Sequence, residues 1–184
     1  MDSPFNPVSL ALGAEASFVA RTVDSHRAHL TEVLRAAISH RGAALVEIYQ
    51  NCPIFNDGAF DGLKGPDSGL IPLRHGEPIV FGSDGSLGIV RGPDGTLRSA
   101  PVVEVGLENV LVHAAHRDDP GLAFELSRLT DTGTIVNAPI GIFRDVQRPS
   151  YDDLARAQVS MPVDPAERLA SLQGLINGPD TWTV

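Results

Sequence analysis

The first fifty residues alternate between helical and extended patterns of apolar positions. Asn6-Pro7 is typical of a helix start, with Asn as the N-cap and Pro at the first helical position. Residues 17–21 then form a short apolar run that predicts a strand. Apolar side chains recur at helical spacing over residues 25–40, and residues 43–49 carry the apolar run of a second strand. Strand, helix and strand joined by short loops predict a right-handed parallel crossover.

A parallel pair of strands is rarely stable by itself. Both of its faces and both of its edges need to be covered by other parts of the protein. We therefore interpret this first segment as the last piece of a larger parallel sheet.

The pattern changes after residue 52. Residues 52–76 are rich in Gly and Pro and predict a long loop, and loops of this length are usually functional or mobile. Short extended segments follow, with turns at Asp84-Gly85 and Pro93-Asp94-Gly95. They predict an antiparallel β-meander with strands at 78–82, 87–91, 97–105 and 110–113. Further elements are expected as a helix capped by Asp119 that continues to residue 129, a strand at 140–143, and a helix at 165–176.

The charge composition of the chain limits the kinds of molecule it is expected to bind. The 184 residues include 14 Lys and Arg against 23 Asp and Glu, a formal charge of −9, which argues against nucleic acid and anionic membranes as partners. The sequence contains no apolar run near the ~18 residues of a membrane span and no signal peptide. A single cysteine excludes an internal disulfide, so a cytoplasmic location is expected.

Cys52 is the residue with the clearest chemical potential. It lies just past the end of a predicted parallel strand, where α/β sheets place ligands and cofactors, and Pro53 fixes the backbone after it. A thiolate there suits a metal ligand or a nucleophile, whereas a lone cysteine is more often an inert buried thiol. Because the chain has no second cysteine, any metal at Cys52 would need ligands from elsewhere.

Two other clusters have structural explanations as well as chemical ones. His113 and His116 are spaced like a helical metal-binding pair, but they flank a predicted turn, which favours structural or surface roles. Asp57, Asp61 and Asp67 lie in the long loop without the register of a calcium loop, which favours a solvated loop. No dinucleotide fingerprint, Walker loop or nucleophile elbow is present.

Several segments together resemble the β subunit of the 2-oxoacid:ferredoxin oxidoreductases. The most specific is the continuous string from Glu47 to Asp61, Glu-Ile-Tyr-Gln-Asn-Cys-Pro-Ile-Phe-Asn-Asp-Gly-Ala-Phe-Asp. Its Asn-Asp-Gly-Ala-Phe-Asp part points to the 2-oxoglutarate-like branch. The similarity covers residues 3–152, and the ending Asp180-Thr181-Trp182 also fits. Supporting segments are Pro4-Phe5-Asn6-Pro7, residues 18–21, His29-Leu30, Phe81-Gly82, residues 113–117, residues 122–124 and residues 141–144.

The resemblance implies an α/β fold, the C-terminal part of a thiamine-diphosphate-binding parallel-sheet domain with an antiparallel β-meander and α extension. It implies oxidative decarboxylation of a 2-oxoacid to an acyl-CoA, with electrons passing to ferredoxin and an α subunit as partner. Cofactors of the complete subunit are thiamine diphosphate, Mg²⁺ and a [4Fe–4S] cluster. Cys52 falls on the fourth cluster-ligand position, while the Gly-Asp-Gly motif and the other cysteines are absent. No catalytic residue is assigned.

The absence of the Gly-Asp-Gly motif and of the other cysteines predicts that the sequence is the C-terminal half of a subunit. A mis-assigned start, a split gene or a truncation would each explain this. Residues 1–52 would complete the cofactor-binding domain, 53–150 would form the C-terminal extension, and 151–184 a tail. The isolated chain is then expected to bind no cofactor and to be inactive. The alternative is a non-catalytic remnant or assembly module. The coding sequence immediately upstream would separate these two hypotheses.

Overall fold

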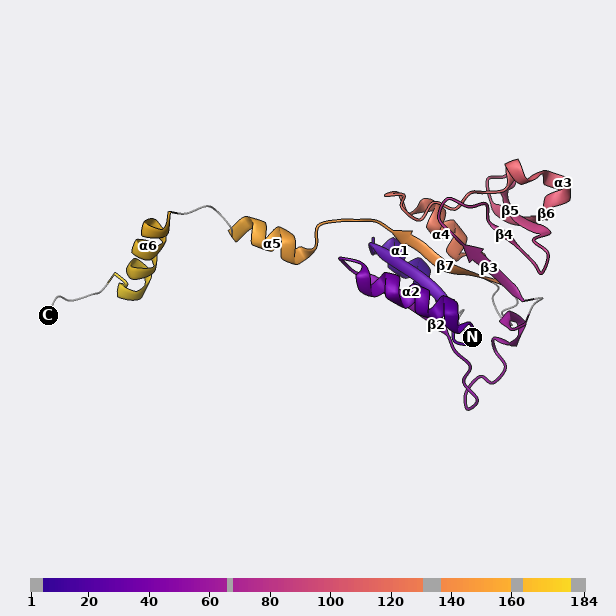
Figure 1. Cartoon of the computed structure of the whole chain (residues 1–184), viewed down its shortest axis with the longest axis horizontal. Coiled ribbons are helices and arrows are strands. Elements are labelled where there is room, and N and C mark those ends of the chain that lie inside the picture. Colours follow the sequence, from indigo (N-terminus) through magenta and orange to yellow (C-terminus); the bar gives the residue numbers. More distant parts are fainter. Residues whose placement is uncertain (1–4, 66–67, 131–136, 160–163, 180–184) are drawn as a thin grey trace. The chain divides into compact units, whose positions relative to one another are not determined.

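The computed structural model describes residues 5–65, 68–130, 137–159 and 164–179 (Figure 1). Contacts divide the chain into two units, the first ending at Arg148 and the second beginning at Pro149. The first unit contains strands β1 (Phe18–Val23), β2 (Ala44–Tyr49), β3 (Gly69–Leu73), β4 (Val80–Phe81), β5 (Leu87–Arg91), β6 (Leu97–Pro101) and β7 (Asn137–Asp145). Its helices are α1 (Pro7–Gly13), α2 (Arg27–Ser39), α3 (Val102–Val105) and α4 (Gly121–Ser127), with 3₁₀ turns η1 (Asp61–Leu63) and η2 (Leu107–Asn109). The second unit contains α5 (Tyr151–Val159) and α6 (Pro165–Asn177).

A four-stranded mixed sheet with the order β2-β1-β7-β3 organises the first unit. β1 and β2 run parallel in the register Phe18↔Ala44 to Val23↔Tyr49, as the crossover predicted. β7 lies antiparallel on the other side of β1, and β3 runs parallel to β7. The parallel pair is therefore completed on one side by a strand from much later in the sequence.

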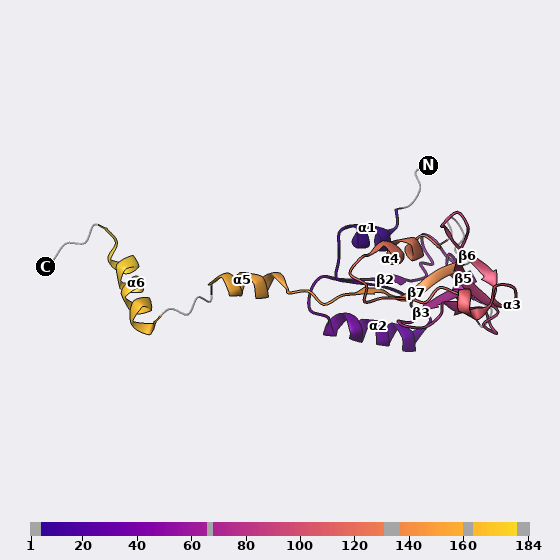
Figure 2. The ribbon, with the colours of Figure 1, turned by 90° about the horizontal axis from the view of Figure 1, so that it is seen from above.

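Helices cover both faces of this sheet, with α1 and α4 on one side and α2 on the other (Figure 2). Under α1 and α4 the buried core includes Leu12, Val19, Leu126 and Phe143. Under α2 the core is smaller and is formed by Phe18, Ala20, Val33 and partly buried neighbours. The helix start predicted at Asn6 is confirmed, because the Asn6 side chain accepts a hydrogen bond from the Ser9 N–H at 3.0 Å.

A buried ion pair joins the two parallel strands. Arg21 on β1 is fully buried, and its Nε donates to Glu47 Oε2 on β2 at 2.6 Å. The Arg21 Nη1 also donates to Thr130 Oγ1 at 2.8 Å, and the guanidinium carbon lies 5.0 Å from the centre of the Tyr49 ring. Arg21 and Glu47 are partners in the strand register, so the pair matches this one alignment of β1 with β2.

The predicted meander is confirmed as a three-stranded antiparallel sheet in the order β4-β5-β6. Its outer segments differ from expectation. The strand predicted at 97–105 ends at Pro101, and residues 102–105 form α3, because Pro101 has no N–H for a ladder and tertiary contacts override the β propensity of the valines. The segment 110–113 forms no strand, although Val112 makes an isolated bridge with Pro78.

The prediction of a continuous loop over residues 52–76 is wrong for residues 69–73, which form β3. Gly69 and Pro72 interrupt the apolar pattern that would have indicated a strand. Proline is tolerated there because β3 lies at an edge of the sheet. The strand expected at 140–143 and the helix expected at 165–176 are confirmed with longer bounds, while α5 was not predicted. The α/β class with an antiparallel appendage is confirmed. The division at residue 52 stays a prediction.

Candidate functional site

Cys52 lies where the sequence predicted, beyond the C-terminal end of β2. β1 and β2 are parallel, so their carboxyl ends open on the same edge of the sheet, the usual location of ligands in α/β proteins. Cys52 begins a turn in which its carbonyl oxygen accepts a hydrogen bond from the Asn56 N–H at 3.0 Å. The turn places the sulfur of Cys52 among backbone amides rather than in a hydrophobic core.

The preceding residue, Asn51, stabilises this loop through both polar atoms of its side-chain amide. Its side-chain oxygen accepts a hydrogen bond from the Gly58 N–H at 2.9 Å, and its Nδ2 donates to Asp57 Oδ1 at 2.9 Å. Gly58 has a φ of +75°, a conformation that suits glycine. The loop that carries Cys52 is therefore held by side-chain bonds and does not depend on a bound group for its shape.

The electrostatic environment of Cys52 favours the thiolate. Hydrogen bonding from the backbone N–H of Phe55, and then of Ile54 and Asn56, lowers the pKa of the Cys52 thiol. Cys52 is the only cysteine of the sequence, and it is half-buried. Metal ligation requires a deprotonated sulfur, so the donor fits one ligand position of a metal group. Its neighbours Ile54 and Phe55 are 82% and 89% exposed, which gives the loop an apolar tip.

His113 and His116 do not form a metal-binding pair. His113 is 1% exposed, and its Nε2 donates to the Ile142 carbonyl oxygen at 2.7 Å. His116 Nδ1 donates to the Asp145 carbonyl oxygen, also at 2.7 Å. Both rings thus fix the segment after η2 to the carbonyl groups of β7, and the structural interpretation holds. Asp119 accepts from the Gly121 N–H at 2.8 Å, but the N-cap residue of α4 is Pro120 rather than Asp119, and the helix ends at Ser127 instead of residue 129.

The acidic residues of the long loop likewise have structural partners. Asp57 accepts from Asn51, and Asp61 pairs with Lys64 at 2.7 Å. Asp67 and the ending 180–182 lie outside the described residues. Among the described residues, no group of three or more His, Cys, Asp and Glu side chains is placed to hold a metal ion.

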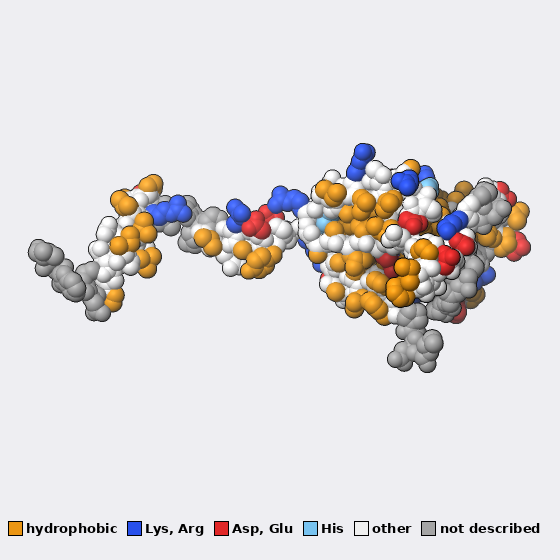
Figure 3. All heavy atoms as spheres, turned by 90° about the horizontal axis from the view of Figure 1, so that it is seen from below, with side chains coloured by type: hydrophobic (Ala, Val, Ile, Leu, Met, Phe, Trp, Pro, Cys, Tyr) orange, Lys and Arg blue, Asp and Glu red, His pale blue; other side chains and the backbone are white. Residues whose placement is uncertain are grey.

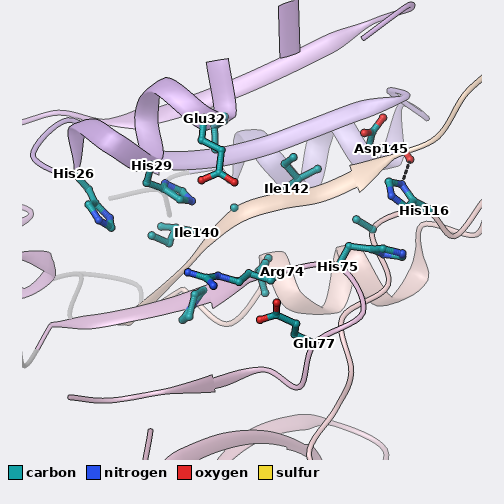
Figure 4. A pocket seen from close by; sticks show the side chains of 15 residues that line it. His26, His29, Glu32, Arg74, His75, Glu77, His116, Ile140, Ile142 and Asp145 are labelled. Carbon is teal, nitrogen blue, oxygen red and sulfur yellow. Dashed lines mark hydrogen bonds between the residues drawn. The ribbon is translucent and has the colours of Figure 1, made fainter. Parts of the chain in front are cut away.

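Sequence patterns did not predict a polar cavity of about 560 Å³ between α2 and strands β3 and β7 (Figure 4). Two histidine pairs line it, His26 with His29 and His75 with His116, and Arg74 lies between them. Glu32, Glu77 and Asp145 add carboxylates. Its described lining holds no Cys, Ser or Lys, so the cavity offers polar contacts rather than a nucleophile. Three separate segments supply the histidines, which is why no local motif reveals it.

One buried and one half-buried histidine, His113 and His29, should make the fold sensitive to acid. Burial lowers the pKa of His113 below its ordinary value of 6.5. The hydrogen bond to the Ile142 carbonyl opposes this by raising the pKa, and the nearby His75 and His116 lower it further by smaller amounts. Burial, followed by His26, lowers the pKa of His29. The unfolded rings take up protons as pH falls below 6.5 while the folded rings stay neutral, so stability is lost on acidification.

We expect the free energy of unfolding to fall between about pH 7 and pH 5, by at most about 1.4 kcal/mol per pH unit for each proton. Urea titrations across this range measure it. His113→Gln keeps an N–H for the Ile142 carbonyl but cannot titrate, so it should flatten part of the dependence. An unchanged pH profile in this variant would contradict the assignment.

No helix among the described residues is long and apolar enough to cross a membrane. The sequence matches no protein-family profile. It is 54% identical over 187 aligned residues to the 2-oxoglutarate oxidoreductase subunit KorB of Mycobacterium tuberculosis, an alignment that covers 100% of this chain and 50% of KorB. Shorter matches are to the 2-oxoacid:ferredoxin oxidoreductase subunit beta of Saccharolobus solfataricus (39% over 57 residues, 31% of this chain and 19% of that one) and to 2-oxoacid:ferredoxin oxidoreductase 2, subunit beta, of Aeropyrum pernix (48% over 52 residues, 28% and 17%).

A solved structure has the same fold. It is a 2-oxoglutarate:ferredoxin oxidoreductase from Magnetococcus marinus with 2-oxoglutarate, coenzyme A and succinyl-CoA bound. The TM-score is 0.53 at 19% identity, over 93% of this chain and 45% of that chain. The resemblance seen in the sequence is confirmed, and the chain spans about half the length of KorB.

Proposed function

We propose that this chain is part of the β subunit of a 2-oxoacid:ferredoxin oxidoreductase. All of the chain aligns with one half of the 2-oxoglutarate oxidoreductase subunit KorB. The reaction is oxidative decarboxylation of a 2-oxoacid, 2-oxoglutarate in the first instance, to an acyl-CoA with electrons passing to ferredoxin. An α subunit and ferredoxin are the protein partners, and the cytoplasm is the location. The carrying observation is the 54% identity to KorB, together with the position of Cys52.

Within this proposal Cys52 ligates one iron of a [4Fe–4S] cluster. A cluster supplies one-electron transfer when it is bound. The residues of this chain contribute a sulfur that is kept as a thiolate by backbone N–H groups, on a loop that Asn51 holds in place. Hydrogen bonds to a ligating sulfur also influence the redox potential of a cluster.

The remaining ligands come from polypeptide that this chain does not represent. The sequence has no second cysteine and no Gly-Asp-Gly motif, so we assign neither thiamine diphosphate nor Mg²⁺ to residues of this chain. Activity is accordingly a property of the assembled complex. As a cluster ligand, Cys52 would serve electron transfer rather than bond formation.

The test is a dye-reduction assay on the complex purified from the source cells through a tag on this chain. We expect reduction of a viologen that depends on both 2-oxoglutarate and coenzyme A, whereas the chain purified alone should reduce none. Pyruvate in place of 2-oxoglutarate tests the substrate class. A complex that contains the tagged chain but lacks 2-oxoacid-dependent reduction would instead support the assembly module.

A further inference from the structure

Three charged side chains of the polar cavity are available to a ligand. Arg74 lies just after β3, Glu77 follows it in the next turn, and Glu32 belongs to α2. All three residues are exposed, and none of their side chains makes an ion pair or a hydrogen bond within the described part of the chain. The third carboxylate of the lining, Asp145, is already engaged by His40 Nδ1 at 3.0 Å. The cavity therefore offers one free cation and two free anions among its described residues.

The two free carboxylates approach the guanidinium from opposite sides. Figure 4 shows Glu32 reaching in from α2 and Glu77 from the turn after β3, with Arg74 between them. Burial, and then His26, lower the pKa of His29 below its ordinary value. Glu32 raises the pKa of the same ring and Arg74 lowers it, so the unlike charges act on one place. Unlike charges that share one space without pairing fit a ligand that carries both charges.

One side of the cavity is apolar and closely packed. Ile140 and Ile142 of β7 and Leu73 of β3 contribute this side. Gly141 has a φ of +119°, and a Cβ there would lie 2.5 Å from the Leu73 carbonyl oxygen. Glycine therefore allows β3 and β7 to approach closely at this point of their register. The result is a fixed apolar surface that suits an aliphatic or aromatic side chain.

The volume of the cavity suits a small molecule. Its volume of about 560 Å³ falls within the ~300–1,000 Å³ of typical small-molecule sites, which combine apolar walls with a few polar groups. The face of the first unit shown in Figure 3 is different, because hydrophobic side chains gather across its middle. An apolar face does not specify a small ligand, whereas the cavity lining specifies both the charges and the apolar part of one.

We propose that this cavity binds an α-amino acid with an apolar side chain. Its carboxylate pairs with Arg74, because a guanidinium offers two parallel N–H donors to a carboxylate. Its ammonium group has three donors, enough for both Glu32 and Glu77. The side chain lies against Ile140 and Ile142. A ligand with a single negative charge would meet two like charges, and one with a single positive charge would leave Arg74 unpaired.

This site goes beyond the proposed function. No residue of its lining has a part in that function, and Cys52 does not line the cavity. The amino acid is bound and not transformed, because the described lining contains no Cys, Ser or Lys.

The test is isothermal titration calorimetry of the full chain and of the complex purified through its tag. We expect saturable binding of the probes L-leucine, L-methionine and L-phenylalanine. Two analogues keep the side chain of leucine and remove one charge each: 4-methylpentanoate lacks the ammonium group, and 3-methylbutylamine lacks the carboxylate. Each should bind about tenfold more weakly than L-leucine, or worse. This comparison uses the unaltered protein and does not depend on the folding of any variant.

Charge-removing variants identify the partner of each ligand group. Arg74→Gln should weaken binding of L-leucine by about tenfold or more and leave 3-methylbutylamine unaffected. Glu32→Gln should weaken L-leucine and 3-methylbutylamine but not 4-methylpentanoate. Arg35→Gln on α2 and Glu104→Gln on α3 change exposed residues outside the lining and should stay within about twofold. Circular dichroism checks that each variant is folded.

Three results would each overturn the proposal. They are absence of saturable binding of all three amino acids, equal binding of L-leucine and its two analogues, and unchanged binding of L-leucine to Arg74→Gln. Binding to the isolated chain but not to the complex would also overturn it, because the cavity would then belong to an interface.

Discussion

Under the proposed function, Cys52→Ala in the assembled complex is expected to lower the iron content and abolish electron transfer to ferredoxin. An iron of the cluster requires a thiolate, and alanine offers no ligand atom. The surrounding loop should persist, because Asn51 holds it through Gly58 and Asp57 rather than through the sulfur. Thiamine diphosphate binding should survive, since no residue of this chain is assigned to it. Iron analysis, visible absorbance and dye reduction measure the three outcomes.

A matched control is Lys64→Ala, which removes an exposed cation of the same loop and should leave iron content unchanged. In the isolated chain the thiol should react with an alkylating probe at neutral pH, because the backbone N–H groups of Phe55 and Ile54 lower its pKa. A Cys52→Ala complex that keeps its cluster absorbance and turnover would return Cys52 to the role of an inert thiol.

Glu47→Ala should destabilise the first unit by about 3–5 kcal/mol, because it leaves the fully buried Arg21 without its charge partner. The free energy of unfolding from urea titration measures this loss. Glu47→Gln keeps an oxygen acceptor and should cost less. Replacing both partners, in Arg21→Met with Glu47→Leu, should recover most of the stability.

The control pair is Arg91 with Glu125, whose side chains are 45% and 43% exposed and 2.7 Å apart. Glu125→Ala should cost about 0–1 kcal/mol, because an exposed ion pair is screened by solvent. Equal losses from Glu47→Ala and Glu125→Ala would show that burial of Arg21 does not control the energy of its pair.

Local patterns predicted the crossover and the position of Cys52, because both depend on residues close together in the sequence. The period of α2 and the Asn6 cap are signals of this kind. β3 was not predicted because Gly69 and Pro72 are typical loop residues. The segment becomes an edge strand only through its pairing with β7, which is distant in the sequence. The histidine-lined cavity could not be predicted either, because its histidines come from α2, the end of β3 and the segment before α4, which meet only in the folded chain.

The pairing of β1 with β7 has a consequence for how the chain folds during synthesis. Ala20 pairs with Ile142, so β1 and α2 leave the ribosome long before the strand that completes one side of their sheet. Contacts this distant in sequence close slowly, since most of the chain must be ordered between them. Folding of the first unit is therefore expected to wait until β7 has emerged, and until then β1 has an uncovered side on which chaperones can act.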